Sequence, residues 1–204
     1  MYNFFGMDGV LYKIATLIYN IMVLSLLWLL FSIPLFTIGA STTALFFVTT
    51  RLISNHERYL WRDFWSSFKS NFRQATLTWL MTAAIGFVLF GTDHSTFRTL
   101  VLLARIPLSI ELVLISIYIY PIYARFDVKL TDAVKSAFIM ANRHILTSVC
   151  CMAVALTVLL AAYLYPIFLL AAMGVYAYSS SFLFMRLFRK YHPEIDGDNS
   201  NICA

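Results

Sequence analysis

Long apolar runs without charge dominate the chain, and charged residues gather in the segments between them. Residues 14–50 carry no charge, and Pro34 and Gly39 interrupt this run near its middle. Residues 145–185 form a second uncharged run, which Pro166 breaks. Because a membrane-spanning helix needs about 20 largely apolar residues, each run is long enough for two helices joined by a turn. With two further apolar runs, the pattern predicts six spans, at residues 14–33, 37–53, 75–92, 99–124, 145–164 and 167–186.

Two segments between these spans have the spacing of amphipathic helices. In residues 58–74, aromatic side chains recur at i, i+3, i+4 and i+7, and charged residues fall elsewhere on the helix. These aromatic residues are Trp61, Phe64, Trp65, Phe68 and Phe72. A weaker stripe consists of Leu130, Val134, Ala137, Phe138 and Ala141. Each pattern predicts a helix in the membrane interface, with a docking surface for a cytoplasmic partner as the alternative.

The composition limits the class of protein. Hydrophobic residues make up 61% of the chain and charged residues 12%, against roughly a quarter charged in soluble domains. A disordered chain needs low hydrophobicity and high charge, so that class is excluded. A chain of this size cannot bury so much apolar surface in one soluble core, which leaves a protein of the bilayer.

The net charge of +5 is explained by where the basic residues lie. They concentrate before the first span, in residues 51–73 and 125–143, and after the last span. Six spans place all four segments on one side, and the positive-inside rule makes that side the cytoplasm. No nucleic-acid partner is needed to explain the charge. Each predicted hairpin ends in an arginine at the inner interface, and these residues are Arg51, Arg125 and Arg186. Either the three hairpins descend from one repeated unit, or arginine simply favours that interface.

Together these patterns predict an all-α polytopic transmembrane helical bundle. It has three helical hairpins, two cytoplasmic amphipathic helices and both termini inside. Residues 1–190 form a single transmembrane domain, and residues 191–204 a short polar cytoplasmic tail. Residues 37–53 are short for a span, so a re-entrant segment is the alternative there.

Glu111 is the one carboxylate inside a predicted span. An ionisable group in a span is a functional candidate because it is costly unless paired or wetted. Arg105 lies about 240° away around an ideal helix and does not share its face. Glu111 is therefore either an interface carboxylate that reaches water or a site for a proton or substrate.

The chain shows no motif for catalysis or metal binding. It has no H-E-x-x-H, C-x-x-C, G-x-S-x-G or P-loop pattern. Cys150 and Cys151 are adjacent in an apolar run, which is typical of buried helix positions. We therefore expect no enzyme activity, metal or cofactor. Small hydroxyl residues in the second span either let helices pack closely or line a polar path for sugar; they are Thr37, Ser41, Thr42, Thr43, Thr49 and Thr50.

Five short stretches resemble the YesL-like family of bacterial membrane proteins. They are LWLLFSIP at residues 27–34, TIGASTTAL at 37–45, YLWRDFW at 59–65, FKSNFRQ at 68–74 and YPIYARFD at 120–127. The resemblance extends to about residue 190. It implies a multi-pass protein of the bacterial cytoplasmic membrane with uncharacterised biochemistry. Such proteins are commonly encoded beside genes for complex-carbohydrate uptake and breakdown, including ABC sugar transporters.

The resemblance favours an accessory or regulatory subunit for carbohydrate (oligosaccharide) uptake. Its partners would be the lipid bilayer and the permease or ATPase of an ABC sugar transporter. The alternative is a self-contained transporter of sugars or other small solutes that acts as a homo-oligomer. Few charged residues in the spans and the small size argue against that alternative.

Overall fold

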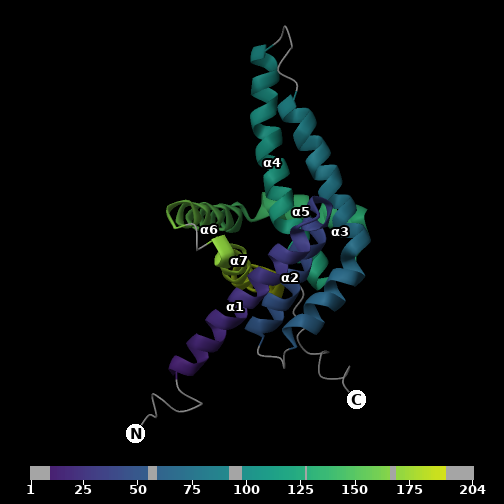
Figure 1. The fold of residues 1–204 in the computed structure, drawn as a ribbon. Helices are drawn as coiled ribbons and strands as arrows, with labels where there is room; N and C mark the ends of the chain where they lie inside the picture. The colour runs from purple at the N-terminus through teal and green to yellow at the C-terminus, as the bar shows by residue number, and fades with distance from the viewer. Residues whose placement is uncertain (1–9, 55–58, 92–97, 127, 166–168, 192–204) are drawn as a thin grey trace.

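The computed structural model describes residues 10–54, 59–91, 98–126, 128–165 and 169–191. Within these residues the chain is all α, as the sequence predicts, and contains no strand. Figure 1 shows the helices, which are α1 (Val10–Ser32), the 3-10 turn η1 (Leu35–Thr37), α2 (Ile38–Ile53), α3 (Leu60–Gly91), α4 (Arg98–Arg125), α5 (Leu130–Arg143), α6 (Ile145–Leu164) and α7 (Leu169–Tyr191). The predicted polar tail lies outside the described residues, apart from Tyr191 at the end of α7.

Helix α2 is the buried centre of the molecule. It packs against α1, α3, α4 and α7, and Ala40, Ala44, Leu45 and Val48 have no exposed surface. In its most apolar window 67% of the residues are buried, against at most 33% in the other long apolar helices. Protein rather than lipid therefore surrounds most of α2, whereas the other helices carry the apolar outer surface.

The turn between α1 and α2 falls where the sequence predicts it. Pro34 begins it, and the amide of Thr37 donates to the Pro34 carbonyl oxygen at 2.8 Å. Gly39 follows at the point where α2 meets α3. A Cβ at Gly39 would lie 2.4 Å from the carbonyl oxygen of Ala75, so only glycine permits this close approach.

Helix α3 corrects the prediction for residues 58–92. The sequence predicts a separate interfacial helix followed by a span, but the structure has one continuous helix. The physical reason is the lack of a helix breaker, since this stretch has no proline and Gly86 is its one internal glycine. Its first half and the turn that follows pair with α2, with Arg51 beside Asp63 and Gly39 beside Ala75 and Trp79.

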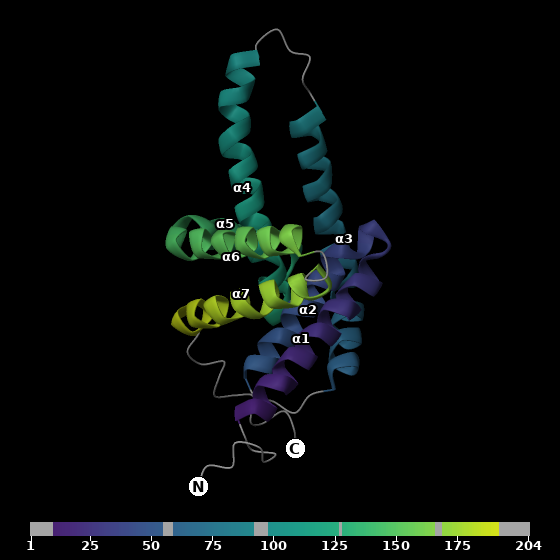
Figure 2. The same cartoon turned by 60° about the vertical axis from the view of Figure 1, so that its left-hand side comes forward.

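This register also corrects the predicted alignment of the second and third spans. Gly39 is predicted near the outer end of span two, and Ala75 at the inner start of span three. Because the two residues touch, the two spans do not lie side by side over their full lengths. The second half of α3 instead runs beside the first half of α4, and Figures 1 and 2 show this pair extending beyond the other helices.

Helix α5 forms where the second amphipathic pattern predicts it, but its buried face is different. Ala133, Ala137 and Ala141 are fully buried, whereas Val134 is 36% and Phe138 49% exposed. Small alanines let α5 approach α4 closely, so the bulky apolar side chains turn outward. The predicted stripe is therefore divided, with Ala137 and Ala141 in the core and Val134 and Phe138 still exposed.

Helices α6 and α7 pack on each other, and α7 also packs on α1 and α2. At the crossing of α1 and α7, the amide of Gly174 donates to Ser25 Oγ at 2.9 Å. A Cβ on Gly174 would lie 2.3 Å from that oxygen. In Figures 1 and 2, α5, α6 and α7 lie across the direction of the α3–α4 pair rather than parallel to it.

Five helices of the described part of the chain are long and apolar enough to cross a membrane. They cover Leu11–Ser32, Leu35–Ile53, Leu60–Leu89, Arg105–Arg125 and Ile145–Leu164. Helix α7, predicted as the sixth span, is not among them, since tyrosines and a run of three serines lower its hydropathy. The chain thus has the character of a membrane protein with several spans.

Candidate functional site

The aromatic row on α3 divides into a buried and an exposed part. Phe64 is fully buried and Phe68 is 7% exposed. Both rings pack against Phe31 of α1, with centroids 5.5 and 5.1 Å from it. These two side chains belong to the core that joins α3 to the α1–α2 pair, so they are unavailable to lipid or to a partner.

The other three aromatic residues remain accessible and form what we call the aromatic face. Trp61 is 57%, Trp65 40% and Phe72 37% exposed. Lys69 lies beside them, with its Nζ 6.0 Å from the centroid of the Trp65 ring. Exposed tryptophans beside a lysine suit either a membrane interface or a protein interface, where tryptophan is enriched.

An ion pair anchors the start of α3 below this face. Arg51 Nη1 lies 3.1 Å from Asp63 Oδ1, and the guanidinium lies 4.7 Å from the Phe47 ring centroid. Asp63 is in the first turn of α3, where a negative charge is favourable. The predicted inner-interface residue Arg51 therefore fixes the connection between α2 and α3.

The other two predicted inner-interface arginines lie at or near helix ends. Arg125 is the last residue of α4. Arg186 is near the end of α7, with its Cζ 5.8 Å from the Phe182 ring centroid. Both positions agree with the sequence prediction that an arginine lies toward the end of each hairpin.

Glu111 meets an amide from another helix. Asn142 Nδ2, at the end of α5, donates to Glu111 Oε1 at 3.0 Å. Glu111 is half-buried, as is Arg105 earlier on the same helix. Sequence reasoning missed Asn142 because the contact joins two helices and depends on how they pack.

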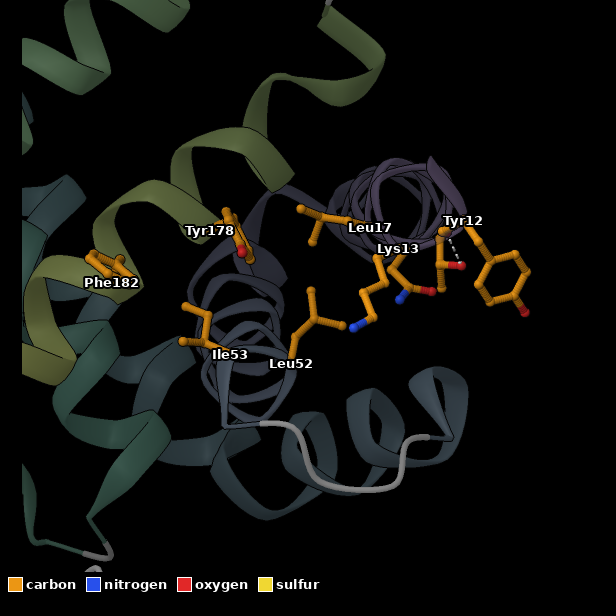
Figure 3. A pocket seen from close by; sticks show the side chains of 9 residues that line it. Tyr12, Lys13, Leu17, Leu52, Ile53, Tyr178 and Phe182 are labelled. Atoms are coloured by element: carbon orange, nitrogen blue, oxygen red, sulfur yellow. Dashed lines mark hydrogen bonds between the residues drawn. The ribbon is translucent and has the colours of Figure 1, made fainter. Parts of the chain in front are cut away.

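A pocket of about 600 Å³ lies between α1, α2 and α7. Figure 3 shows Lys13 extending from α1 toward Leu52 of α2, with Tyr178 and Phe182 contributed by α7. The lining residues are Tyr12, Lys13, Thr16, Leu17, Asn20, Leu52, Ile53, Tyr178 and Phe182. The sequence prediction did not include this inner pocket. Its one local signal is the helical spacing of Lys13, Thr16, Leu17 and Asn20.

The hydroxyl residues of α2 serve helix packing rather than this pocket. Thr43 and Thr49 are fully buried, and each hydroxyl donates to the backbone carbonyl oxygen four residues earlier. Trp28 Nε1 donates to Thr42 Oγ1 at 3.1 Å across the α1–α2 contact. None of these residues lines the inner pocket, and their burial and hydrogen bonds agree with the helix-packing interpretation.

Among the residues that the structure describes, no group of three His, Cys, Asp or Glu side chains is placed to hold a metal ion. Cys151 is buried, as predicted for the cysteine pair, but Cys150 is exposed on the helix surface. An apolar helix in a bilayer can expose a cysteine to lipid at no cost. The chemistry of the described surface therefore lies in the aromatic face, the Glu111–Asn142 contact and the inner pocket.

Comparison with protein families gives one match, which covers less than half of the chain. A family model described as "Protein of unknown function, DUF624" matches residues 21–91. The match covers the second half of α1, all of α2 and all of α3, including the aromatic face. Searches of the curated proteins and of the solved structures gave no match.

Proposed function

We propose that the protein is an accessory or regulatory subunit for carbohydrate uptake, and that it binds the permease or ATPase of an ABC sugar transporter. The resemblance to YesL-like proteins supports the carbohydrate context. The family match over residues 21–91 is compatible with that resemblance and adds no activity to it. The observation that carries the proposal is the exposed aromatic face on α3.

The length of α3 and the position of this face near its start support placing the face at the inner interface. At 32 residues and 1.5 Å per residue, α3 is about 48 Å long, whereas the hydrocarbon core is about 30 Å thick. Its first half carries most of its polar residues, including Lys69 and Arg73. The two tryptophans of this face lie near the start of α3, beside the Arg51–Asp63 ion pair at the end of α2 that the topology places inside, so a partner subunit can reach them from the cytoplasm.

The proposed topology has six spans, of which α7 is the last. The protein lies in the bacterial cytoplasmic membrane, with both termini on the cytoplasmic side. The inner pocket supports it because the start of α1, the end of α2 and the later part of α7 meet there. These are the ends that the positive-inside rule places on one side. This orientation requires residues 37–53 to cross fully, since a re-entrant segment there would return the end of α2 to the outer side.

Affinity purification from native membranes in mild detergent, followed by mass spectrometry, tests the partner. We expect an ABC sugar permease or its ATPase to be recovered in fixed ratio. The double variant Trp61→Ser/Trp65→Ser should reduce recovery about tenfold or more, because buried tryptophans at interfaces often contribute about 2 kcal/mol or more. Both side chains are exposed, so the variant should still fold.

The matched control is Phe87→Ser, which removes an aromatic side chain that is 79% exposed on the other half of α3. It should leave recovery of the partner unchanged. Equal recovery with wild type and the double variant would reject the docking role of the aromatic face. Recovery of the chain alone as a stable oligomer would favour a self-contained transporter instead.

A further inference from the structure

We propose that the inner pocket binds the head group of an anionic phospholipid from the inner leaflet. The inference rests on the inside orientation of the pocket given under Proposed function. It does not depend on the identity of the protein partner. Four features of the pocket support this ligand, namely its positive charge, the Asn20 amide, its apolar wall and its place at the helix ends.

Lys13 supplies the charge. Of the nine residues that line the pocket in the described part of the chain, Lys13 alone carries a formal charge. Its side chain is exposed at the mouth, so a head group can reach it. Arg186 adds a second positive charge close by, over the ring of the lining residue Phe182. Two positive charges, with no negative charge among the lining residues, favour an anion over a zwitterion or a cation.

Asn20 supplies an unpaired donor. Its side chain is 8% exposed, and the structure contains no hydrogen bond between its amide and any described residue. The amide is among the groups that line the pocket, so a ligand that enters the pocket can accept a hydrogen bond from its Nδ2. Asn20 lies on the same face of α1 as Lys13, two turns further along. A phosphate oxygen between the two would accept from both.

The remaining wall is apolar and suits the start of an acyl chain. Leu17 of α1 and Leu52 of α2 line the pocket, and Phe182 of α7 contributes an aromatic edge that is 54% exposed. A small soluble anion would leave these groups unused. A phospholipid uses both parts, with its phosphate on Lys13 and Asn20 and its glycerol and first methylenes on the apolar wall.

The location favours lipid as the source of the anion. The pocket lies at the helix ends that are assigned to the inner interface, where anionic head groups are abundant. Basic pockets between membrane helices on that side are a recurrent form of lipid recognition. The ligand is therefore already concentrated where the pocket opens.

Native mass spectrometry of the purified full-length protein tests the proposal. The protein in detergent is titrated with phosphatidylglycerol and, separately, with phosphatidylcholine of the same acyl chains. We expect selective retention of phosphatidylglycerol. Lys13→Gln should weaken it about fivefold, as for one lysine near an anionic surface. Lys135→Gln removes an exposed lysine from α5 and should change nothing.

Asn20→Leu, which keeps the side-chain size, should also weaken retention of phosphatidylglycerol. Asn20 is buried, so its substitution can also affect folding. The decisive variant is therefore Lys13→Gln, because Lys13 is exposed at the mouth of the pocket. Equal retention of both lipids, or equal loss in Lys13→Gln and Lys135→Gln, would overturn the proposal. So would competition by soluble glycerol phosphate at the same concentration as the lipid, because the acyl chains would then contribute nothing.

This test uses the isolated chain and needs no partner subunit. Loss of lipid selectivity with normal recovery of a transporter partner would reject the pocket alone. Normal selectivity without a partner would reject the accessory function and leave the pocket standing.

Discussion

Single small residues decide how closely the helices of this molecule approach. Gly39 lies against the backbone of Ala75, and Gly174 against Ser25 Oγ and the backbone of Ile21. In a membrane, where lipid is as apolar as the side chains, close packing and hydrogen bonds replace the hydrophobic effect as the source of helix association. These contacts are therefore the positions most sensitive to an added methyl group.

Gly39→Ala should destabilise the protein by about 1–3 kcal/mol, the usual cost of overpacking. The new Cβ would lie 2.4 Å from a backbone oxygen of α3, which cannot rotate away as a side chain can. Thermal unfolding in detergent, followed by circular dichroism, measures the effect.

Gly86→Ala is the matched control, because a Cβ added at Gly86 would have no neighbouring atom within 4 Å. Alanine favours helix over glycine by up to about 1 kcal/mol. This variant should be neutral or slightly stabilised. A Gly39→Ala protein as stable as Gly86→Ala would mean that α2 and α3 do not touch at this point.

At the scale of elements, α3 combines two roles, which belong to its amphipathic first half and its apolar second half. Its first half joins the core through Phe64 and Phe68 and presents the aromatic face at the edge of that core, where the Trp61 and Trp65 rings also contact Phe31. Its second half pairs with α4 and exposes large apolar residues such as Phe87 and Val88. One continuous helix thus links the proposed docking surface near its start to the apolar half that pairs with α4.

Phe64→Ser and Trp65→Ser should behave differently although the residues are adjacent. Phe64 is fully buried, so its loss should cost about 3–5 kcal/mol, as for large-to-small changes at core phenylalanines. Trp65 is 40% exposed and should cost much less. Yield of folded protein and thermal unfolding in detergent compare the two.

Similar losses for both variants would show that the aromatic row is buried on both sides, which would remove the docking surface. Similar tolerance of both would show that α3 does not pack on Phe31. Either outcome would contradict the division of the row into a core part and an aromatic face.

Apolar periodicity predicted the existence of every helix in the described residues but not every boundary between helices. The predicted limits of residues 145–164 coincide with α6 (Ile145–Leu164), because Arg143 and His144 precede the run and Pro166 interrupts it. The continuity of α3 was missed because the change from amphipathic to apolar character at Ala75 resembles a boundary, although no residue there breaks a helix. The buried alanine face of α5 was missed because larger apolar residues dominated its stripe.

At the scale of the whole molecule, α2 is enclosed by its neighbours, and apolar surface faces outward on the other long helices. Composition and charge were enough to predict an all-α membrane protein. The inner pocket and the Glu111–Asn142 contact were not predictable, since each joins residues from helices far apart in the chain. Such sites depend on crossing geometry, which periodicity does not encode.

The central claim is that the aromatic face is on the cytoplasmic side. A single cysteine introduced by Ser66→Cys, next to Trp65 and exposed, tests it directly once Cys150, Cys151 and Cys203 are replaced. A membrane-impermeant maleimide should label this cysteine only after the cells are permeabilised. Gly91→Cys, at the other end of α3, should be labelled in intact cells. Labelling of the Ser66→Cys protein in intact cells would contradict the account.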